Sequence, residues 1–163
     1  MVIMNKGELQ QIGTVDEIWN RPANKFVAYF VGEPAMNFIN GRIESSESVS
    51  IPTPQGKRIF KFNGKINTKY IGSEITIGIR PQQIKVYREK QEENAIPGEV
   101  RIIEFQGEAT VLTLDLGNSM KSEVKAVVAT TERYATGETV WLYCGPEFIH
   151  LFDGDVPILP RDI

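Results

Sequence analysis

The sequence predicts a mainly β fold, a small barrel or sandwich of many short strands, with a short helical segment in front of it. From about residue 37 onward, apolar and polar residues alternate with a period of two. Gly, Pro or Asn interrupts this alternation roughly every eight to twelve residues, which is typical of short strands joined by turns. A stretch of residues also recurs 65 positions later without a gap, which indicates two copies of one β unit.

Two short helices are expected within residues 1–35. Thr14 and Glu17 have the spacing of a capping box, in which each side chain accepts a hydrogen bond from the other residue's backbone N–H. Pro22 ends this helix and lies in the first turn of a second one, which ends at Gly32. We expect the large aromatic residues of this segment to be buried against the β region or a second copy of the chain: Trp19, Phe26 and Phe30.

Nine strands are expected in the rest of the chain. Residues 89–94 form the most polar stretch and are expected to be an exposed connector in the middle of the β region. The expected strands are residues 38–44, 57–62, 74–80, 84–88, 99–105, 109–116, 123–128, 139–144 and 148–152.

Each copy of the repeat is interpreted as a strand, a proline turn and a second strand. The inward apolar positions agree between the copies, while the outward positions differ. On this alignment Cys144 is a core residue, and His150 takes the outward, solvated position of Lys85. The identical residues are Gly72 and Gly137, Pro81 and Pro146, and Ile84 and Ile149.

The composition is that of a globular protein, since 41% of the 163 residues are hydrophobic and 24% are charged. One cysteine excludes an internal disulfide and favours a reducing compartment, and one histidine argues against a zinc site.

Residues 57–90 hold nine basic and two acidic side chains, whereas residues 91–163 hold five basic and thirteen acidic ones. This distribution favours two solvated faces of opposite sign. It leaves open an anion site in the basic half, or docking between the two faces.

The sequence contains no enzyme signature. A phosphate-binding P-loop needs Gly, four residues and then Gly-Lys-Ser/Thr, and neither Gly-Lys pair, at Lys57 and Lys65, fits this pattern. A Ser-His-Asp site would have to use His150, the one histidine. Asp153 and Asp155 resemble the start of a calcium loop, but no terminal glutamate completes it. The sequence therefore predicts no catalytic, cofactor-binding or metal-ligating residue.

A series of short motifs runs along nearly the whole chain. They are Gln11-Ile-Gly-Thr14, Arg21-Pro-Ala-Asn24, Phe26-Val-Ala28, Ile77-Gly-Ile-Arg-Pro81, Gly107-Glu108 and His150-Leu-Phe-Asp153. In this order they resemble the carboxyl-terminal part of the ATP-binding subunit of ABC importers, of the maltose, multiple-sugar and glycerol-phosphate class. The resemblance implies that residues 1–35 are the end of the nucleotide-binding domain, a hairpin with two short helices. Residues 36–163 would be a regulatory TOBE domain of two OB-like barrel units.

The resemblance also implies a function, that of the regulatory and dimerisation domain of an importer for sugars or related polyols. The chain would be a fragment without the ATP-hydrolysing motifs and not itself an enzyme, so ATP and magnesium would belong to the full-length subunit. The implied partners are a second copy of the chain, the membrane subunits of the transporter, and a regulatory protein or small effector, but no nucleic acid. The implied location is cytoplasmic, peripheral to the inner face of the plasma membrane through the transporter.

Six residues are candidates for a regulatory site or a dimer interface. Pro81 is expected to fix a tight turn between strands. For Arg80 the alternatives to a role in that turn are an acidic group of the partner subunit or a bound anion. The candidates are Arg80, Pro81, Glu104, Glu108, His150 and Phe152.

Two other functions are compatible with an OB-like fold. The basic residues 57–90 give a physical reason for a module that binds a small oxyanion such as molybdate, sulfate or phosphate. Lysines spread along strands, however, make a diffuse potential and not a converging site. Aromatic residues among the lysines would favour single-stranded nucleic acid, but the alternation buries Phe60 and Phe62 together and the net charge is negative.

Overall fold

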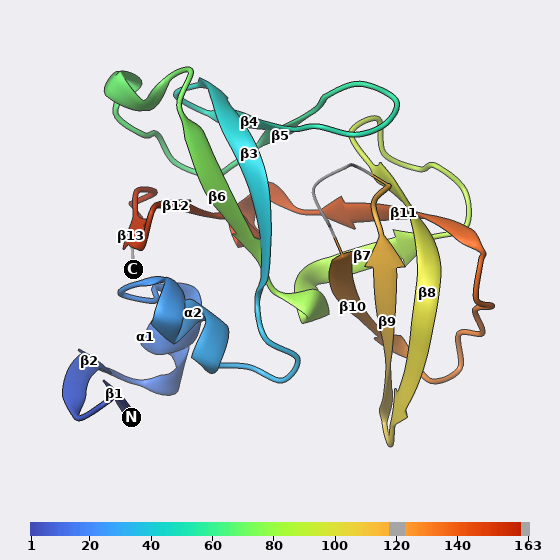
Figure 1. The fold of residues 1–163 in the computed structure, drawn as a ribbon, viewed down its shortest axis with the longest axis horizontal. Helices are drawn as coiled ribbons and strands as arrows, with labels where there is room; N and C mark the ends of the chain where they lie inside the picture. Colours follow the sequence, from blue (N-terminus) through green and yellow to red (C-terminus); the bar gives the residue numbers. More distant parts are fainter. Residues whose placement is uncertain (118–122, 161–163) are drawn as a thin grey trace.

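The computed structural model describes residues 1–117 and 123–160 (Figure 1). In its first part, β1 (Val2–Asn5) pairs antiparallel with β2 (Glu8–Ile12), and α1 (Val15–Asn20) and α2 (Lys25–Phe30) follow. We refer to residues 1–36 as the helical segment. No helix in the described part of the chain is long and apolar enough to cross a bilayer.

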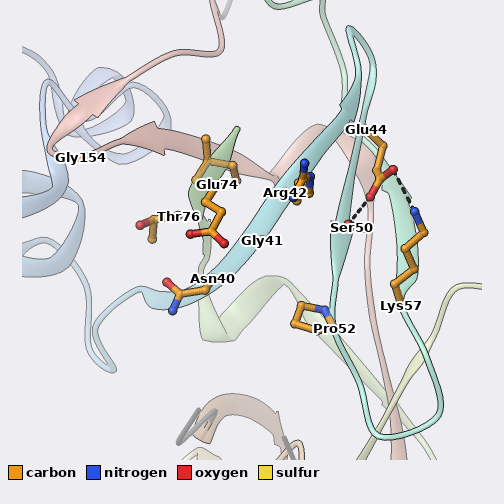
Figure 2. Close-up of a pocket in the computed structure, with 11 residues that line it drawn as sticks. Asn40, Gly41, Arg42, Glu44, Ser50, Pro52, Lys57, Glu74, Thr76 and Gly154 are labelled. Atoms are coloured by element: carbon orange, nitrogen blue, oxygen red, sulfur yellow. Dashed lines mark hydrogen bonds and ion pairs between the residues drawn. The ribbon is translucent and has the colours of Figure 1, made fainter. Parts of the chain in front are cut away.

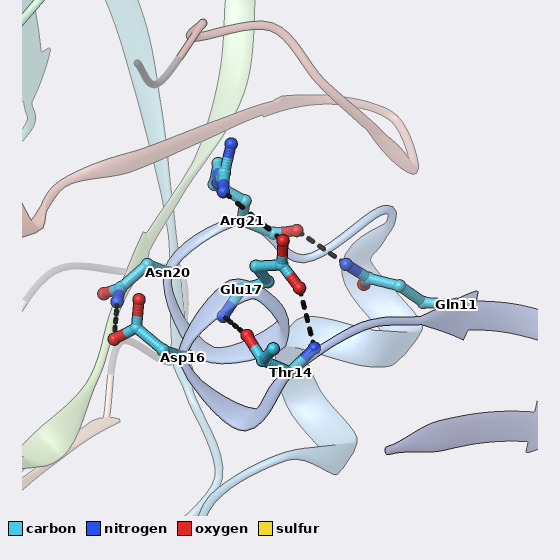
Figure 3. A network of polar contacts seen from close by, with 6 residues as sticks. All are labelled: Gln11, Thr14, Asp16, Glu17, Asn20 and Arg21. Carbon is cyan, nitrogen blue, oxygen red and sulfur yellow. Dashed lines mark hydrogen bonds and ion pairs between the residues drawn. The ribbon is translucent and has the colours of Figure 1, made fainter. Parts of the chain in front are cut away.

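The predicted capping box opens α1. The Thr14 hydroxyl accepts a hydrogen bond from the Glu17 amide at 3.2 Å, and the Glu17 carboxylate accepts one from the Thr14 amide at 2.7 Å (Figure 3). The hydrogen bond that the Glu17 carboxylate accepts from the Thr14 amide lowers the pKa of Glu17. Beyond the other end of the helix, the Gln11 side chain donates to the Arg21 carbonyl at 2.9 Å and so ties β2 to the turn after α1.

The second helix begins later than predicted. Its first residue is Lys25, and Pro22 lies before it, because the Asn24 side chain accepts a hydrogen bond from the Val27 amide at 2.8 Å and caps the first turn. Gly32 follows the helix with a φ of +126°, a conformation that favours glycine. The predicted stop is therefore confirmed, while the predicted start is wrong.

The remaining strands form two antiparallel sheets. The six-stranded sheet has the order β13-β12-β6-β3-β4-β5, and the five-stranded sheet has the order β10-β9-β8-β11-β7. Three 3₁₀ turns lie between strands: η1 (Thr68–Tyr70), η2 (Pro81–Gln83) and η3 (Pro146–Phe148). The strands are β3 (Asn37–Ser45), β4 (Ser48–Ile51), β5 (Arg58–Lys61), β6 (Glu74–Ile79), β7 (Ile84–Tyr87), β8 (Ile96–Gln106), β9 (Ala109–Asp115), β10 (Glu123–Ala129), β11 (Thr139–Cys144), β12 (His150–Asp153) and β13 (Val156–Pro157).

The predicted mainly β fold is confirmed, and each of the nine predicted strands is present: β11 has the predicted ends, and the other eight are shifted at one end or at both. The largest shift at a strand start is in β8, which begins at Ile96. The prediction missed β4 and β13. Strand β4 is a run of four residues with two serines, and β13 has two residues, so neither is long enough to show a clear alternation.

The 65-residue repeat is a structural duplication in which the two units exchange strands. We call β3–β7 the first unit and β8–β12 the second. Strand β7 crosses to the five-stranded sheet and pairs with β11, while β12 crosses to the six-stranded sheet and pairs with β6. The two pairings share one register: Leu142 lies opposite Val86, and Ile77 lies opposite Leu151, each residue 65 positions from its counterpart.

Apolar faces of both sheets form the main core. Cys144 is buried there with 5% of its surface exposed, as the repeat predicted, and Phe60 and Phe62 are each 4% exposed. The alternation along the strands therefore identified the inward positions correctly.

The duplicated glycines Gly41 and Gly98 provide a matched pair of substitutions. Gly41 lies opposite Ile75 and Gly98 opposite Val140, which are repeat-equivalent positions. A Cβ at Gly41 would lie 2.4 Å from Ile77 Cδ1 and 2.8 Å from a backbone oxygen, whereas a Cβ at Gly98 would meet nothing nearer than 3.5 Å. We expect Gly41→Ala to lower the free energy of unfolding by about 2 kcal/mol through overpacking, and Gly98→Ala to change it by less than about 1 kcal/mol. Urea denaturation measures both, and equal losses would contradict this packing.

Candidate functional site

Arg80 lies where the helical segment meets the six-stranded sheet. It follows β6 and precedes the η2 turn, and only 1% of its surface is exposed. Its guanidinium reaches the helical segment. Nη2 donates to the Trp19 carbonyl at 2.7 Å, and Nη1 donates to the carbonyls of Val31 at 2.6 Å and Ala28 at 3.3 Å. One side chain thus bridges two helices and a strand.

The positive charge of Arg80 lies at the carboxyl ends of both helices. The Trp19 carbonyl belongs to the last turn of α1, and those of Ala28 and Val31 to the end of α2, where carbonyls have no partner within the helix. Neither helix has a basic residue in its own last turn. Arg80 therefore supplies the charge that favours these ends, and its hydrogen bonds compensate for burying that charge.

The indole of Trp19 completes the environment of Arg80. The guanidinium carbon lies 3.8 Å from the centroid of the Trp19 ring, a distance at which a cation is attracted to the ring face. The chain passes close by at Gly32, where a Cβ would lie 3.3 Å from Arg80 Nη1. The Arg80 guanidinium, the Trp19 indole and the backbone at Gly32 thus lie in contact with one another. We call this cluster the Arg80 junction.

Apolar contacts extend the junction over the outer face of β3, β6 and β12. Phe152 is fully buried and forms a cluster with Ala28 and Met36, and Phe38 packs against this cluster. The ring of Phe38 meets the ring of Phe152 edge to face at 5.8 Å. A Cβ at Gly78 would lie only 2.6 Å from the Met36 sulfur. The absence of a side chain at Gly78 therefore lets the helical segment approach the sheet.

The prediction that His150 is solvated is wrong. His150 lies opposite Gly78 in the β12–β6 pair, on the outward face as the repeat predicted, but only 6% of its surface is exposed. The outward face of the six-stranded sheet, in which β12 lies, carries the helical segment, whereas the equivalent Lys85 in β7 of the five-stranded sheet is exposed. The repeat predicted correctly that the His150 side chain points outward. The helical segment that buries it lies outside the repeat, so the repeat could not predict its burial.

The six candidate residues fall into two groups. Arg80, Pro81, His150 and Phe152 are buried within the chain on the side of the Arg80 junction. Glu104 and Glu108 lie on and after β8, in the β8–β9 hairpin, which is on the other side of the view from the helices (Figure 1). Glu104 is partly exposed and pairs with Lys125 at 3.4 Å, while Glu108 is exposed. A regulatory or dimer-interface role for the six residues stays a prediction.

The aromatic residues of the helical segment differ from one another in burial. Trp19 and Phe26 are partly buried, and Phe26 packs against the cluster of Ile3, Ile18 and Val27. Phe30 is not buried within the chain, because 62% of its surface is exposed; its burial against a second copy stays a prediction. The buried stripe of α2 is narrower than its sequence suggested, and Phe30 only stacks on Phe26 at 5.6 Å.

A polar pocket of about 780 Å³ lies on the outer face of the six-stranded sheet (Figure 2). At one end, Glu44 accepts hydrogen bonds from Ser50 at 2.6 Å and from Lys57 at 2.9 Å, which lower the pKa of its carboxyl group. Arg42 lies in the middle, and Glu74 lines the pocket as well. Because carboxylates alternate with the cations, this pocket has no surplus of positive charge that would select an anion.

No cluster of three or more metal-ligating side chains is found among the described residues. Sequence reasoning missed Trp19 as the partner of Arg80. Its indole and its carbonyl both contact Arg80, although the two residues are far apart in the sequence and no motif joins them.

Comparisons with known proteins match nearly all of these elements. The family profile of the MalK OB-fold domain matches residues 32–84, and that of the TOBE domain matches residues 77–152. The two matches overlap in the segment that contains Arg80.

Two curated relatives are similar over most of the chain. An uncharacterized ABC transporter ATP-binding protein of Sinorhizobium fredii is 36% identical over 94% of this chain and 38% of its own length. The sn-glycerol-3-phosphate import ATP-binding protein UgpC of Escherichia coli K12 is 35% identical over 95% of this chain and 41% of its own length. The chain therefore spans about two-fifths of the length of these relatives.

One solved structure has a similar fold. A crystal structure of the cytoplasmic molybdate-binding protein ModG with molybdate bound gives a TM-score of 0.56 at 14% identity, over 71% of this chain and 94% of that one. At this identity the similarity concerns the fold alone.

Proposed function

Because the chain belongs, through its MalK OB-fold and TOBE domains, to the ATP-binding subunits of ABC transporters, we propose that it forms the regulatory and dimerisation domain of such a subunit in an importer. The imported class would be sugars or related polyols, and the similarity to UgpC, a glycerol 3-phosphate import protein, supports the polyols. The chain would act without catalysis of its own, while a nucleotide-binding domain binds ATP and magnesium. It would lie on the cytoplasmic side of the membrane through the transporter.

The Arg80 junction is the observation that carries this proposal. A regulatory domain has to be conformationally coupled to the domain that hydrolyses ATP. Rigid, well-packed elements can carry such coupling. The helical segment is fixed to the β units by a buried guanidinium and by the packing of Phe152. A displacement of the helical segment would therefore move the β units with it.

The exposed side of the helical segment supports a nucleotide-binding domain as its neighbour. Apolar side chains of β1, β2 and α2 lie on the surface there, each more than half exposed, and exposed apolar side chains that gather on one part of a surface favour a protein contact. They are Val2, Met4, Leu9, Ile12 and Phe30. The proposed partners are this domain, a second copy of the chain and the membrane subunits of the transporter.

An exchange of domains tests the proposed function. This chain replaces the matching region of UgpC in a cell that depends on UgpC for import of glycerol 3-phosphate. We expect uptake to be retained by the chimera and to fall when the chimera carries Arg80→Ala, with equal amounts of both proteins in the membrane fraction. A well-assembled chimera without uptake would contradict the regulatory role. An uptake that is indifferent to Arg80→Ala would contradict the part given to the junction.

The alternative function, binding of a small oxyanion, is supported only by the similarity of this fold to that of the molybdate-binding protein ModG. The polar pocket holds Glu44 and Glu74 beside Arg42 and Lys57, so an oxyanion would meet carboxylates of its own sign. Calorimetric titration with millimolar molybdate, sulfate and phosphate is expected to give no heat of binding, and saturable heat would restore this alternative.

A further inference from the structure

The outer face of the six-stranded sheet is covered by the helical segment along only part of its length. Where the helical segment packs on it, the outward side chains are apolar, as at Phe38 and Phe152. The next outward positions along β3 and β6 are polar, since alternate residues of a strand point to the same face. They are Asn40, Arg42 and Thr76, and all three line the polar pocket. The pocket is thus the part of this face that the helical segment leaves uncovered.

One end of the polar pocket has hydrogen-bonding groups without protein partners. Asn40 lies opposite Thr76, and Arg42 lies opposite Glu74, in the β3–β6 pair. In the view, Arg42 stands between Glu74 and Glu44 (Figure 2). Asn40, Arg42 and Glu74 are exposed, and their side chains have no hydrogen bond or ion pair to another described residue. An amide, a guanidinium and a carboxylate are therefore free to bind a ligand.

The other end of the polar pocket is held in place. Ser50, only 5% exposed, donates a hydrogen bond to Glu44 Oε1 at 2.6 Å, and Lys57 donates one to Glu44 Oε2 at 2.9 Å. These bonds hold the carboxylate in one orientation, and each of its oxygens keeps a further acceptor site. Glu44 is therefore preorganised to accept a hydrogen bond from a ligand at little cost in side-chain entropy.

The charges of the lining select the class of ligand. Two cations, Arg42 and Lys57, and two carboxylates, Glu44 and Glu74, line the pocket, so the lining has no net charge. An anion would meet the carboxylates, a cation would meet the two basic groups, and an apolar ligand would bury charges without a partner. A hydroxyl group both donates and accepts. A neutral ligand with several hydroxyls therefore satisfies both kinds of group, and a volume of about 780 Å³ is that of a small-molecule site.

The second β unit has different groups at the equivalent positions. By the strand registers, Glu99 takes the place of Arg42, and Asp115 takes the place of Ser50. Arg101 pairs with Glu99 at 3.1 Å and with Asp115 at 2.9 Å. These charges satisfy one another, so the second unit does not offer a ligand the groups that the polar pocket offers.

The polar pocket adjoins the start of α2. The Lys25 ammonium donates to the hydroxyl of Thr76 at 3.4 Å, and the Lys25 amide donates to the carboxylate of Asp155 at 3.1 Å. Thr76 lines the pocket, and so does Gly154, which precedes Asp155. A ligand that contacts Thr76 and Gly154 would hold both of them in place and, through Lys25, stabilise the first turn of α2.

We propose that the polar pocket binds a neutral polyol or sugar and that the bound ligand stabilises the start of α2. A small effector of the same chemical class as the proposed cargo would then act on the helical segment. The regulatory part of this inference rests on the proposed function, whereas the binding itself does not.

A heteronuclear NMR titration of the purified, isotope-labelled chain tests the proposal. The probes are the polyol sorbitol and the disaccharide maltose, each up to about 50 mM so that weak binding is detected. Glycine is the comparison, because a zwitterion would use the charges of the pocket alone. We expect at least one of the two polyhydroxy probes to give saturable amide shifts in residues 40–44 and 74–76, and also in residues 25–28, and glycine to give none.

A pair of arginine variants locates the binding. We expect Arg42→Ala to weaken it by at least about tenfold, as for the loss of a hydrogen bond to a charged group. Arg101→Ala, the matched control in the second unit, should leave it unchanged. Circular dichroism confirms that each variant is folded. Glu74 is also exposed in the pocket, so Glu74→Ala, with the same expected loss, replaces Arg42→Ala if that variant does not fold.

Distinct results would overturn each part of the inference. Shifts that rise without saturation, or saturation with glycine alone, would overturn the polyol site. Equal binding by Arg42→Ala and the wild-type chain would overturn its location. Saturable shifts at the pocket without a change in residues 25–28 would overturn the link to α2. The proposed regulatory function is tested separately by the chimera with UgpC, so its failure is distinguishable from failure of the site.

Discussion

Replacing Arg80 by alanine is expected to lower the free energy of unfolding by about 3–5 kcal/mol. The carbonyls of Trp19, Ala28 and Val31 would lose their donor, and a buried group left without a partner costs about 1–3 kcal/mol. The Trp19 indole would also lose the cation stacked on its face. Urea denaturation followed by circular dichroism measures the change.

Two controls separate the junction from a general effect of removing arginine. Arg80→Lys keeps the charge but lacks the planar guanidinium, whose several N–H groups reach carbonyls of both helices. We therefore expect a loss of unfolding free energy between that of the wild type and that of Arg80→Ala. Arg88 also stacks on an aromatic ring, that of Tyr134 at 4.7 Å, and pairs with Glu138, but its side chain is 55% exposed. We expect Arg88→Ala to cost less than about 1 kcal/mol. An Arg80→Ala variant as stable as Arg88→Ala would contradict the role of the junction.

Removing the Phe152 ring is expected to have an effect of similar size. This side chain is fully buried between β12 and the helical segment, beside Met36 and Ala28, and truncation of a buried phenylalanine costs about 3–5 kcal/mol. Phe105→Ala is the matched control, since its ring is 66% exposed and its loss should cost less than about 0.5 kcal/mol. Thermal and urea denaturation of both variants give the comparison, and comparable losses would show that Phe152 does not hold the helical segment.

The sequence carried most of the information about strands and inward faces. The repeat predicted that Cys144 is buried, and alternation predicted the burial of Phe60 and Phe62. Neither pattern predicts that β7 and β12 cross to each other's sheet. Alternation determines which side of a strand is apolar, but it contains nothing about which neighbour pairs with the strand.

The candidate site was predicted only in part. Arg80 is one of the six candidates that the sequence indicates, but its partners are carbonyl groups. Every residue has a carbonyl group, so a sequence pattern does not identify these partners. His150 was assigned the correct face and the wrong burial, because its cover comes from the helical segment. Such long-range contacts depend on tertiary packing and not on local pattern.

Hydrogen exchange measured by mass spectrometry tests most directly whether Arg80 joins the helical segment to the β units. Peptides that cover residues 15–31 and residues 139–144 are compared between the wild-type chain and Arg80→Ala under conditions in which both are folded. We expect the Arg80→Ala variant to lose protection in residues 15–31 while β11 keeps it, because local opening then needs no disruption of the main core. Unchanged protection in residues 15–31 would contradict the account, since the helical segment would then be held without Arg80.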